Sequence, residues 1–310
     1  MATTNTVNSN YAGKEAGAII GAAFKEADTL RLGLLTVMEN VNYKANLRKI
    51  RYTDGTVDYT CGFTPEGAVV LSEKTIEPKK VMNPIQICKE DFRQTWSEDQ
   101  GGASASNPNL PADEAEAMQM QILASQAEKV DEEIWSGLNA TNGEIGDGFI
   151  VQFAADANII KDGNGITAPG HSVTESTVEA DIKLALAAIP RALRRRKDLV
   201  VAVSPDVFQA YGFYLISKGI ANDGVADEKQ TKFGKYMMTE VNGLPDDTIV
   251  IYAKSNMIFA TGLKSDHNQL TLVDEDEIGL LTGNVRGKLV YNGGMGYYNS
   301  EEIVYLDLTA

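Results

Sequence analysis

The chain has 310 residues, of which 43% are hydrophobic and 23% are charged, a balance typical of a protein that folds around its own core. Its 43 Asp and Glu against 28 Lys and Arg give a net charge of −15. Proteins that read nucleic-acid sequence neutralise phosphates with surplus Lys and Arg, so this charge argues against that class. It also rules out a polybasic protein that adheres to membranes.

Cysteine and histidine are too few for a metal site or a disulfide framework. The chain has two Cys and two His, with no C-x-x-C pair and no cluster at metal-ligand spacing. These residues are Cys61, Cys88, His171 and His267. We expect reduced thiols in a cytoplasmic setting. Residues 1–10 are polar and contain no Lys or Arg, so we expect no secretory signal. The apolar segment Ala16–Phe24 is far shorter than the ~20 residues that span a bilayer.

An N-terminal arm is predicted for residues 1–44. Its start is polar, and residues 11–38 have in part the apolar spacing of a helix, interrupted by Gly13, Gly17 and Gly21. Each glycine weakens a helix by up to ~1 kcal/mol relative to alanine. We interpret the segment as a surface arm that orders on a neighbour. Alternatively, the four-residue spacing of these glycines lets another chain approach this segment closely.

An extended β-ribbon is predicted for residues 45–80. From about Leu47 the pattern has the two-residue period of a strand. Ile50 and Tyr52 alternate with Arg51 up to Asp54-Gly55, a dipeptide typical of two-residue hairpins. The alternation then resumes at residues 57–61, where we expect the return strand of a hairpin.

The second half of the ribbon follows a Pro/Gly turn at residues 64–67. Residues 68–81 predict an extended segment with few large apolar side chains and many charged ones. Because an isolated two-stranded ribbon is marginal in water, we expect the ribbon to lie on a neighbouring copy of the chain. Its charged residues are candidates for contact between subunits: Glu73, Lys74, Glu77, Lys79 and Lys80.

One long helix is predicted at residues 111–139, after a loop at 97–110. Asn109 is a candidate N-cap, and Pro111 suits the first helical turn. At 1.5 Å per residue this helix would be a rod of ~40 Å, a length typical of a structural element. Its apolar stripe consists of Met118, Ile122, Ala127, Val130, Ile134 and Leu138.

A compact α/β unit is predicted for residues 176–262. Ser176 and Glu179 fit a capping box at the start of its first helix, which Pro190 ends or kinks. The continuous apolar run Leu199–Val203 predicts a buried strand.

The rest of the chain is predicted to be mainly β. A second helix begins at Ser204-Pro205, and a polar loop spans residues 219–235. Strands then follow at Thr248–Tyr252 and Met257–Ala260, joined by a short turn. The last predicted strands are Gln269–Val273, Gly279–Val290 and Glu301–Leu308.

No catalytic or nucleotide-binding motif is complete. The Gly-Lys pairs lack the rest of a P-loop, and the Gly293–Gly296 cluster does not lie between a strand and a helix. We interpret Asp162–Gly165 as a tight turn rather than a calcium loop, and Asp274–Glu277 as a solvated turn rather than a cation site. His171 and His267 are interpreted as loop residues. We expect no catalytic residue, no cofactor, no metal site and no enzymatic activity.

Basic residues are concentrated at the end of the first helix of the α/β unit. They are Arg191, Arg194, Arg195, Arg196 and Lys197. Cations complement the negative end of a helix dipole, which is the simpler interpretation. Contact with an acidic surface of a neighbouring subunit, or with packaged nucleic acid, is the alternative. These five residues are therefore further candidates for contact between subunits.

The order of these segments resembles that of the major capsid proteins of tailed bacteriophages, which have the Hong Kong 97-type fold. The similar segments are Phe63–Val81 (descending half of the family's E-loop), Ile85–Phe92 (the segment leading out of it), Pro111–Asn139 (spine helix of the peripheral domain), Ser176–Tyr214 (helix–strand–helix of the axial domain), Val241–Tyr252 with Met257–Ala260 (later sheet of the axial domain) and Val285–Leu308 (returning strands of the peripheral domain).

The resemblance implies an α+β protein with an N-terminal arm, an extended β-ribbon or E-loop, a long spine helix in a peripheral domain and a compact α/β axial domain. The expected parts are the arm at 1–44, the ribbon at 45–80, the peripheral domain at 81–175, the axial domain at 176–262 and returning strands of the peripheral domain at 263–310.

The resemblance also implies a function, that of a non-catalytic major capsid protein. Such a protein self-assembles into the icosahedral shell around the double-stranded DNA of a tailed phage. Its partners would be copies of itself in hexamers and pentamers, portal and minor or decoration proteins, and packaged DNA without sequence preference. Its place would be the virion capsid, assembled in the host cytoplasm.

Two features of some family members are not matched. Some begin with a scaffolding extension, whereas β structure here begins near Leu47, which implies a separate scaffolding protein or a precursor already trimmed. Others form Lys–Asn crosslinks between subunits. No matching motif is recognisable, so we predict none.

Two other functions stay open at the level of sequence. A soluble α/β enzyme or ligand-binding protein built on residues 176–262 would use the loop at 204–206, at the end of a buried strand where α/β sheets bind ligands. A non-viral encapsulating shell protein has the same fold and differs in its cargo.

Overall fold

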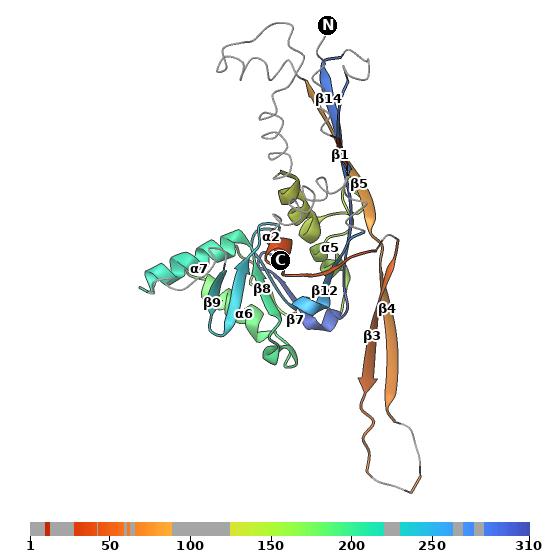
Figure 1. Ribbon diagram of the computed structural model, residues 1–310. Coiled ribbons are helices and arrows are strands. Elements are labelled where there is room, and N and C mark those ends of the chain that lie inside the picture. The colour runs from red at the N-terminus through yellow and green to blue at the C-terminus, as the bar shows by residue number, and fades with distance from the viewer. Residues whose placement is uncertain are drawn as a thin grey trace, which may run out of the picture.

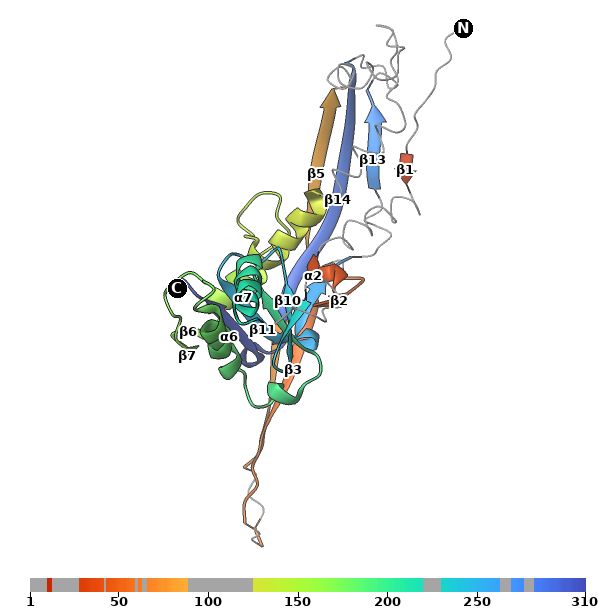
Figure 2. The same cartoon turned by 90° about the vertical axis from the view of Figure 1, so that its left-hand side faces the viewer.

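Two β-sheets, a long β-ribbon and several helices make up the structure, a computed structural model (Figure 1). It describes residues 10–12, 28–41, 43–58, 61–62, 66–88, 125–219, 230–262, 269–275 and 282–310. Within these residues the chain is an α+β protein, as predicted. The ribbon extends from one end of the molecule and the longest strands from the other, with the α/β unit beside the middle (Figure 2).

A five-stranded sheet forms the centre of the α/β unit. Across the sheet the strands are β15 (Ile303–Asp307), β11 (Thr248–Ala253), β8 (Leu199–Val203), β10 (Tyr236–Glu240) and β9 (Gln230–Phe233). β8 and β10 are parallel, and the other neighbours are antiparallel. Helices α6 (Val178–Ala187) and α7 (Pro205–Ser217) pack on the face that carries Val201 and Val203. The predicted buried strand and the helix after it are confirmed.

Two local predictions in this unit are wrong. The capping box does not form, because α6 has Thr177 at its N-cap and Glu179 binds Lys183 and the Tyr214 hydroxyl (2.7 Å) instead. The end of the predicted polar loop at 219–235 is β9, which pairs with β10. Glu179 is thus held by Lys183 and the distant Tyr214, and the end of the predicted loop is one strand of a local hairpin with β10.

A six-stranded sheet is organised around β14 (Asn284–Tyr297), a strand of 14 residues. The other strands are β1 (Asn10–Ala12), β13 (Gln269–Asp274), β12 (Met257–Ala260), β2 (Thr36–Met38) and β5 (Lys79–Cys88). The first part of β14 lies between β13 and β5, and its last part pairs with β12. β14 continues past the predicted end at Val290, because pairing with β12 holds its glycines in the sheet.

Two strands join a different sheet from the one expected. β12 follows β11 after one 3₁₀ turn, η2 (Lys254–Asn256), yet it pairs with β14 and β2. β15, expected among the returning strands of the peripheral domain, pairs with β11. The expected placement of both strands is wrong, because apolar patterns predict strands but not their partners. The division of the chain into domains stays a prediction.

The remaining named elements are short. They are α2 (Asp28–Arg31), α5 (Phe149–Ala155), β6 (Lys161–Asp162), β7 (Gly165–Ile166), η1 (Leu193–Arg195) and η3 (Ser300–Glu302). Between β6 and β7 the chain makes the predicted tight turn, in which the Asn164 amide donates to the Lys161 carbonyl at 2.8 Å. Gly163 and Gly165 both have positive φ there, a conformation that favours glycine.

The described part of the predicted long helix is residues 125–136. Ala127, Val130 and Ile134 are buried, as the apolar stripe predicts. Leu138 lies past the end of the helix and is 48% exposed, so its place on the stripe is wrong. Several other predictions fall outside the described residues: the arm glycines Gly13, Gly17 and Gly21, the loop at 97–110, Met118, Ile122 and His267.

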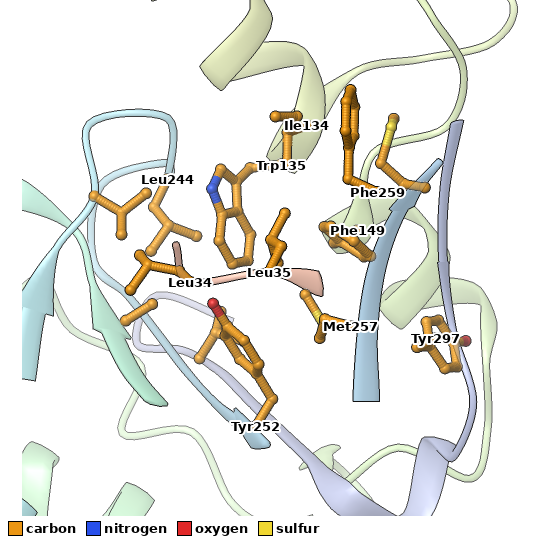
Figure 3. Packing of buried hydrophobic residues seen from close by; sticks show 14 of the residues in the cluster. Leu34, Leu35, Ile134, Trp135, Phe149, Leu244, Tyr252, Met257, Phe259 and Tyr297 are labelled. Atoms are coloured by element: carbon orange, nitrogen blue, oxygen red, sulfur yellow. The ribbon is translucent and has the colours of Figure 1, made fainter. Parts of the chain in front are cut away.

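Trp135, in the last turn of this helix, lies at the centre of the largest core cluster (Figure 3). Its ring lies 5.7 Å from that of Phe149 and 6.1 Å from that of Tyr252, centroid to centroid. The indole N–H donates to Thr29 Oγ1 at 2.8 Å, so this buried polar atom is satisfied. One aromatic side chain thus joins the helix, α5, the five-stranded sheet and the segment around α2.

Asp131, one turn earlier, holds the same junction by hydrogen bonds. Its buried carboxylate accepts from the backbone N–H of Thr29 at 2.9 Å and of Gly243 at 3.0 Å. A Cβ at Gly243 would collide with the Asp131 carbonyl and come within 2.9 Å of Trp135 Cδ1, so the close approach requires glycine. The helix is thereby tied to the N-terminal segment and to the loop before β11.

The ribbon consists of β3 (Ala45–Thr53) and β4 (Ala68–Ile76), paired antiparallel along their whole length. The two-residue hairpin predicted at Asp54-Gly55 is wrong, because the returning strand begins only with β4. Asp54 Oδ1 instead accepts hydrogen bonds from Thr56 N at 3.1 Å and Thr56 Oγ1 at 2.6 Å. This local turn stands in place of the tight hairpin.

Replacing Asp131 by alanine should lower the free energy of unfolding by about 2–6 kcal/mol, because two buried backbone donors lose their acceptor at about 1–3 kcal/mol each. Urea denaturation followed by tryptophan fluorescence measures the change. Glu132→Ala, which removes an exposed carboxylate from the next position of the helix, should change stability by less than about 0.5 kcal/mol. Equal effects of the two substitutions would contradict the assigned role of Asp131.

Candidate assembly surface

The ribbon packs on the molecule through one of its two faces. Leu47 and Ile76 are each 2% exposed and pack with Ile258 and Ala260 of β12. They also lie over the glycine-rich end of β14, where a Cβ at Gly296 would come within 2.5 Å of Ile76 Cγ1. The absence of side chains on this part of β14 lets the base of the ribbon lie directly on the backbone.

Polar contacts continue along the same face toward the tip. The Lys49 ammonium donates to Asn299 Oδ1 at 2.5 Å, and the Arg51 guanidinium forms an ion pair with Glu301 at 2.9 Å. Side chains at every second position of a strand share a face, so Leu47, Lys49 and Arg51 all point to the body. The ribbon is thereby held at its base and again at η3.

Lys74 lies on this inner face and is half-buried. Its ammonium lies 3.2 Å from the ring centroid of Tyr297, whose hydroxyl donates to Asp156 Oδ2 at 2.9 Å. Burial lowers the pKa of Lys74 to about 8, an effect that the negative charge of Asp156 opposes. A cation over an aromatic face is attracted to its electrons, so the contact holds the ribbon to the end of β14.

The opposite face of the ribbon is apolar and exposed. Ile50 lies directly opposite Leu71, and Tyr52 lies opposite Val69. The four residues are between 65% and 69% exposed. Contiguous apolar patches of this kind mark sites of protein–protein contact, since single chains in water bury them. We call these four residues the outer ribbon face.

The charged ribbon residues predicted to contact other subunits are mostly engaged within the chain. Glu73 pairs with Arg48 at 2.8 Å, and Glu77 pairs with Lys44 at 2.5 Å. The Lys79 ammonium donates to the carbonyl of Asn139 at 3.2 Å, and Lys74 is bound as described above. Lys80 is exposed. Exposed ion pairs of this kind contribute little to stability.

The basic cluster divides into two groups. Arg194 donates to the carbonyls of Ile189 (3.0 Å) and Ala187 (3.1 Å), which supports the prediction of a role at the helix C-terminus. Arg196 binds both carboxylate oxygens of Asp198 at 2.8 Å, and the bond holds the pKa of Asp198 well below its usual range. The other three cations, Arg191, Arg195 and Lys197, are exposed.

Sequence reasoning missed the outer ribbon face as a set. The alternation at Ile50 and Tyr52 is visible in the sequence, but the many charged residues of the segment 68–81 obscure its few large apolar side chains. Only the register of β3 with β4 brings Val69 and Leu71 beside them. The signal that would have revealed them is the short apolar run Val69–Leu71 in a segment otherwise rich in charge.

Structural comparison finds this fold in solved capsids. The capsid of a native GTA particle aligns with a TM-score of 0.62 and 11% identity, over 92% of this chain and 91% of that chain. The capsid of Myoviridae phage XM1 aligns with a TM-score of 0.55 and 13% identity, over 90% and 91%. A virus-like particle from Pyrococcus furiosus aligns with a TM-score of 0.52 and 11% identity, over 94% and 97%.

The chain has the Hong Kong 97-type capsid fold. The resemblance inferred from the order of segments is therefore confirmed at the level of the fold. No protein-family model matches the sequence, and no curated protein does. The likeness therefore lies in the path of the backbone, which the capsid fold preserves at 11–13% identity.

Two further properties of the described residues bear on function. None of their helices is both long enough and apolar enough to cross a membrane. Within the same residues, no three His, Cys, Asp or Glu side chains are grouped so as to hold a metal ion.

The burial of Lys74 predicts a rise in stability with pH. The pKa of Lys74 is about 8 in the folded chain and about 10.4 in an unfolded one, so between these values the unfolded state binds more protons. Unfolding therefore becomes less favourable as pH rises from 8 to 10. Lys74→Met removes this contribution, so the stability of wild type relative to the variant should increase over that range in urea denaturation.

Lys80→Met is the matched control, since it removes an exposed ammonium from the neighbouring strand and leaves Lys74 in place. The pH dependence assigned to Lys74 should persist in it. Identical pH profiles for wild type and Lys74→Met would show that burial does not lower the pKa of Lys74 in solution.

Proposed function

We propose that the chain is a major capsid protein, which assembles with copies of itself into the icosahedral shell around the double-stranded DNA of a tailed phage. The observation that carries the proposal is the outer ribbon face. A chain with the capsid fold holds a ribbon rigidly by one face and exposes four large apolar side chains on the other, where a second molecule can cover them.

Assembly by this route needs geometry rather than catalysis. The ribbon and the N-terminal arm would lie over neighbouring subunits, and the α/β unit would surround the five-fold and six-fold axes in pentamers and hexamers. Each contact is weak, but closure of a shell makes many of them act together. The exposed residues Lys80, Arg191, Arg195 and Lys197 belong to this proposal as contacts between subunits.

Other partners follow from the same proposal. A separate scaffolding protein, a portal and decoration proteins would bind the shell, which assembles in the host cytoplasm and becomes the virion capsid. Packaged DNA would be contacted without sequence preference, in keeping with a net charge of −15.

An enzyme built on residues 176–262 gains no support from the end of β8. There the Ser204 hydroxyl accepts from the Thr248 N–H at 3.1 Å, and Asp206 accepts from the Asp247 N–H at 2.8 Å. These polar groups hold backbone rather than face a ligand. A non-viral encapsulating shell is the second candidate, favoured by the match to the virus-like particle from Pyrococcus furiosus.

Expression of the chain, alone and with a scaffolding protein, tests the function by electron microscopy and size-exclusion chromatography. Hollow shells, tubes or capsomers are expected. A folded monomer or dimer under every condition, scaffold included, would count against a shell protein of either kind. Packaged double-stranded DNA supports the phage capsid, and an enclosed enzyme supports the non-viral shell.

Replacing Ile50 and Leu71 by serine should raise the concentration needed for assembly at least tenfold. Burying one such side chain stabilises by about 1.5–3 kcal/mol, and 1.4 kcal/mol corresponds to a factor of ten. The variant should stay folded, because both residues are more than 65% exposed in the single chain. Light scattering against protein concentration measures the threshold.

Leu138→Ser is the control, because it removes an exposed apolar side chain that belongs to neither β3 nor β4. It should assemble at the concentration of the wild type. Unchanged assembly of the ribbon variant would remove the outer ribbon face from the proposed interface.

A further inference from the structure

The two ends of the five-stranded sheet are built from different segments of the chain. At the end where β8 begins, the Lys254 N–H donates to the Asp198 carbonyl at 2.8 Å and the Lys235 ammonium to the Arg194 carbonyl at 3.0 Å. Residues 191–198, 232–236 and 253–255 therefore lie together there. We call this the basic end.

At the other end, where β8 finishes, a second set of segments meets. The Asp247 carboxylate accepts from the Val173 N–H at 2.6 Å, and the Asp247 N–H donates to Asp206 at 2.8 Å. The Leu308 N–H donates to the Asp247 carbonyl at 2.9 Å. Residues 170–177, 204–208, 240–248 and 306–310 therefore lie together. We call this the acidic end.

The charges of the two ends are opposite. The segments of the basic end contain eight Lys and Arg and one acidic residue, Asp198, which is bound by Arg196. Glu302 of η3 also reaches this end, where its carboxylate lies 3.5 Å from the Arg196 guanidinium. The segments of the acidic end contain six Asp and Glu and no Lys or Arg. Exposed charged side chains at the basic end include Arg191, Arg195, Lys197, Lys232 and Lys254, and those at the acidic end are Glu175 and Asp246.

These charges are too far apart to neutralise each other within one chain. The five residues of β8 alone span roughly 16 Å at ~3.3 Å each, which is twice the Debye length of ~8 Å at physiological ionic strength. A chain with a net charge of −15 nevertheless concentrates cations at one end of this sheet. The same α/β unit thus carries a cationic surface and an anionic surface that could complement it on another copy.

We propose that copies of the chain associate head to tail, the basic end of one α/β unit against the acidic end of the next. A heterologous contact of this kind closes into a ring when the rotation between copies is suitable. The inference rests on the proposed shell function and names the surfaces that form the ring. A nucleic acid bound to the basic end would leave the acidic end without a partner, whereas a second copy satisfies both.

Charge reversal at each end tests the proposal. The basic-end variant is Arg191→Glu with Arg195→Glu and Lys197→Glu, and the acidic-end variant is Glu175→Lys with Asp246→Lys. All five positions are exposed, so each variant should remain folded by circular dichroism. Each variant alone should need at least a tenfold higher protein concentration to assemble. Mixed together they should co-assemble into hexamers or tubes, because alternating copies then present opposite charges.

The control variant is Glu128→Lys with Glu132→Lys, which reverses two exposed charges on the helix at 125–136 and should assemble normally. Shells from either end variant alone, or failure of the mixture of folded variants, would overturn head-to-tail pairing while wild-type shells uphold the proposed function. A basic-end variant that assembles but retains less nucleic acid would assign that end to nucleic acid instead. Absence of wild-type shells would defeat the function itself.

Discussion

The contact between the base of the ribbon and the glycine-rich end of β14 is the constraint on which the exposed surface depends. Ile76 lies so close to β14 that a side chain at Gly296 has no room. Because side chains alternate across a strand, burial of Leu47 and Ile76 on one face places Ile50 and Leu71 on the other. One packed contact thus decides how the ribbon leaves the molecule and which side chains it presents to a neighbour.

The ribbon is seated on a body whose distant parts are joined by buried contacts. Trp135 and Asp131 join the helix at 125–136 to the segment around Thr29 and to the loop at Gly243, so three distant parts of the chain share one buried junction. The capsid fold places this junction between the two sheets rather than around a ligand.

The fold distributes the charged side chains unevenly over the surface, and the net charge of −15 does not show this. Arg194 and Arg196 are used to hold the chain around η1, and several ribbon charges pair within the ribbon. What is left exposed is sorted by the strands of the five-stranded sheet, cations to one end and carboxylates to the other. The acidity of the whole chain is thus compatible with specific attraction between copies, since attraction acts over a Debye length and not over the whole molecule.

The sequence by itself determined the elements whose apolar spacing is unambiguous, such as the strand Leu199–Val203, and the order of segments that identifies the capsid fold. These depend on neighbours in the chain. Only the tertiary structure decided that β12 and β15 exchange sheets, that Gly296 seats the ribbon, and that Val69 joins Tyr52 on one face. Those outcomes depend on register and pairing between residues far apart in sequence, which local spacing does not encode.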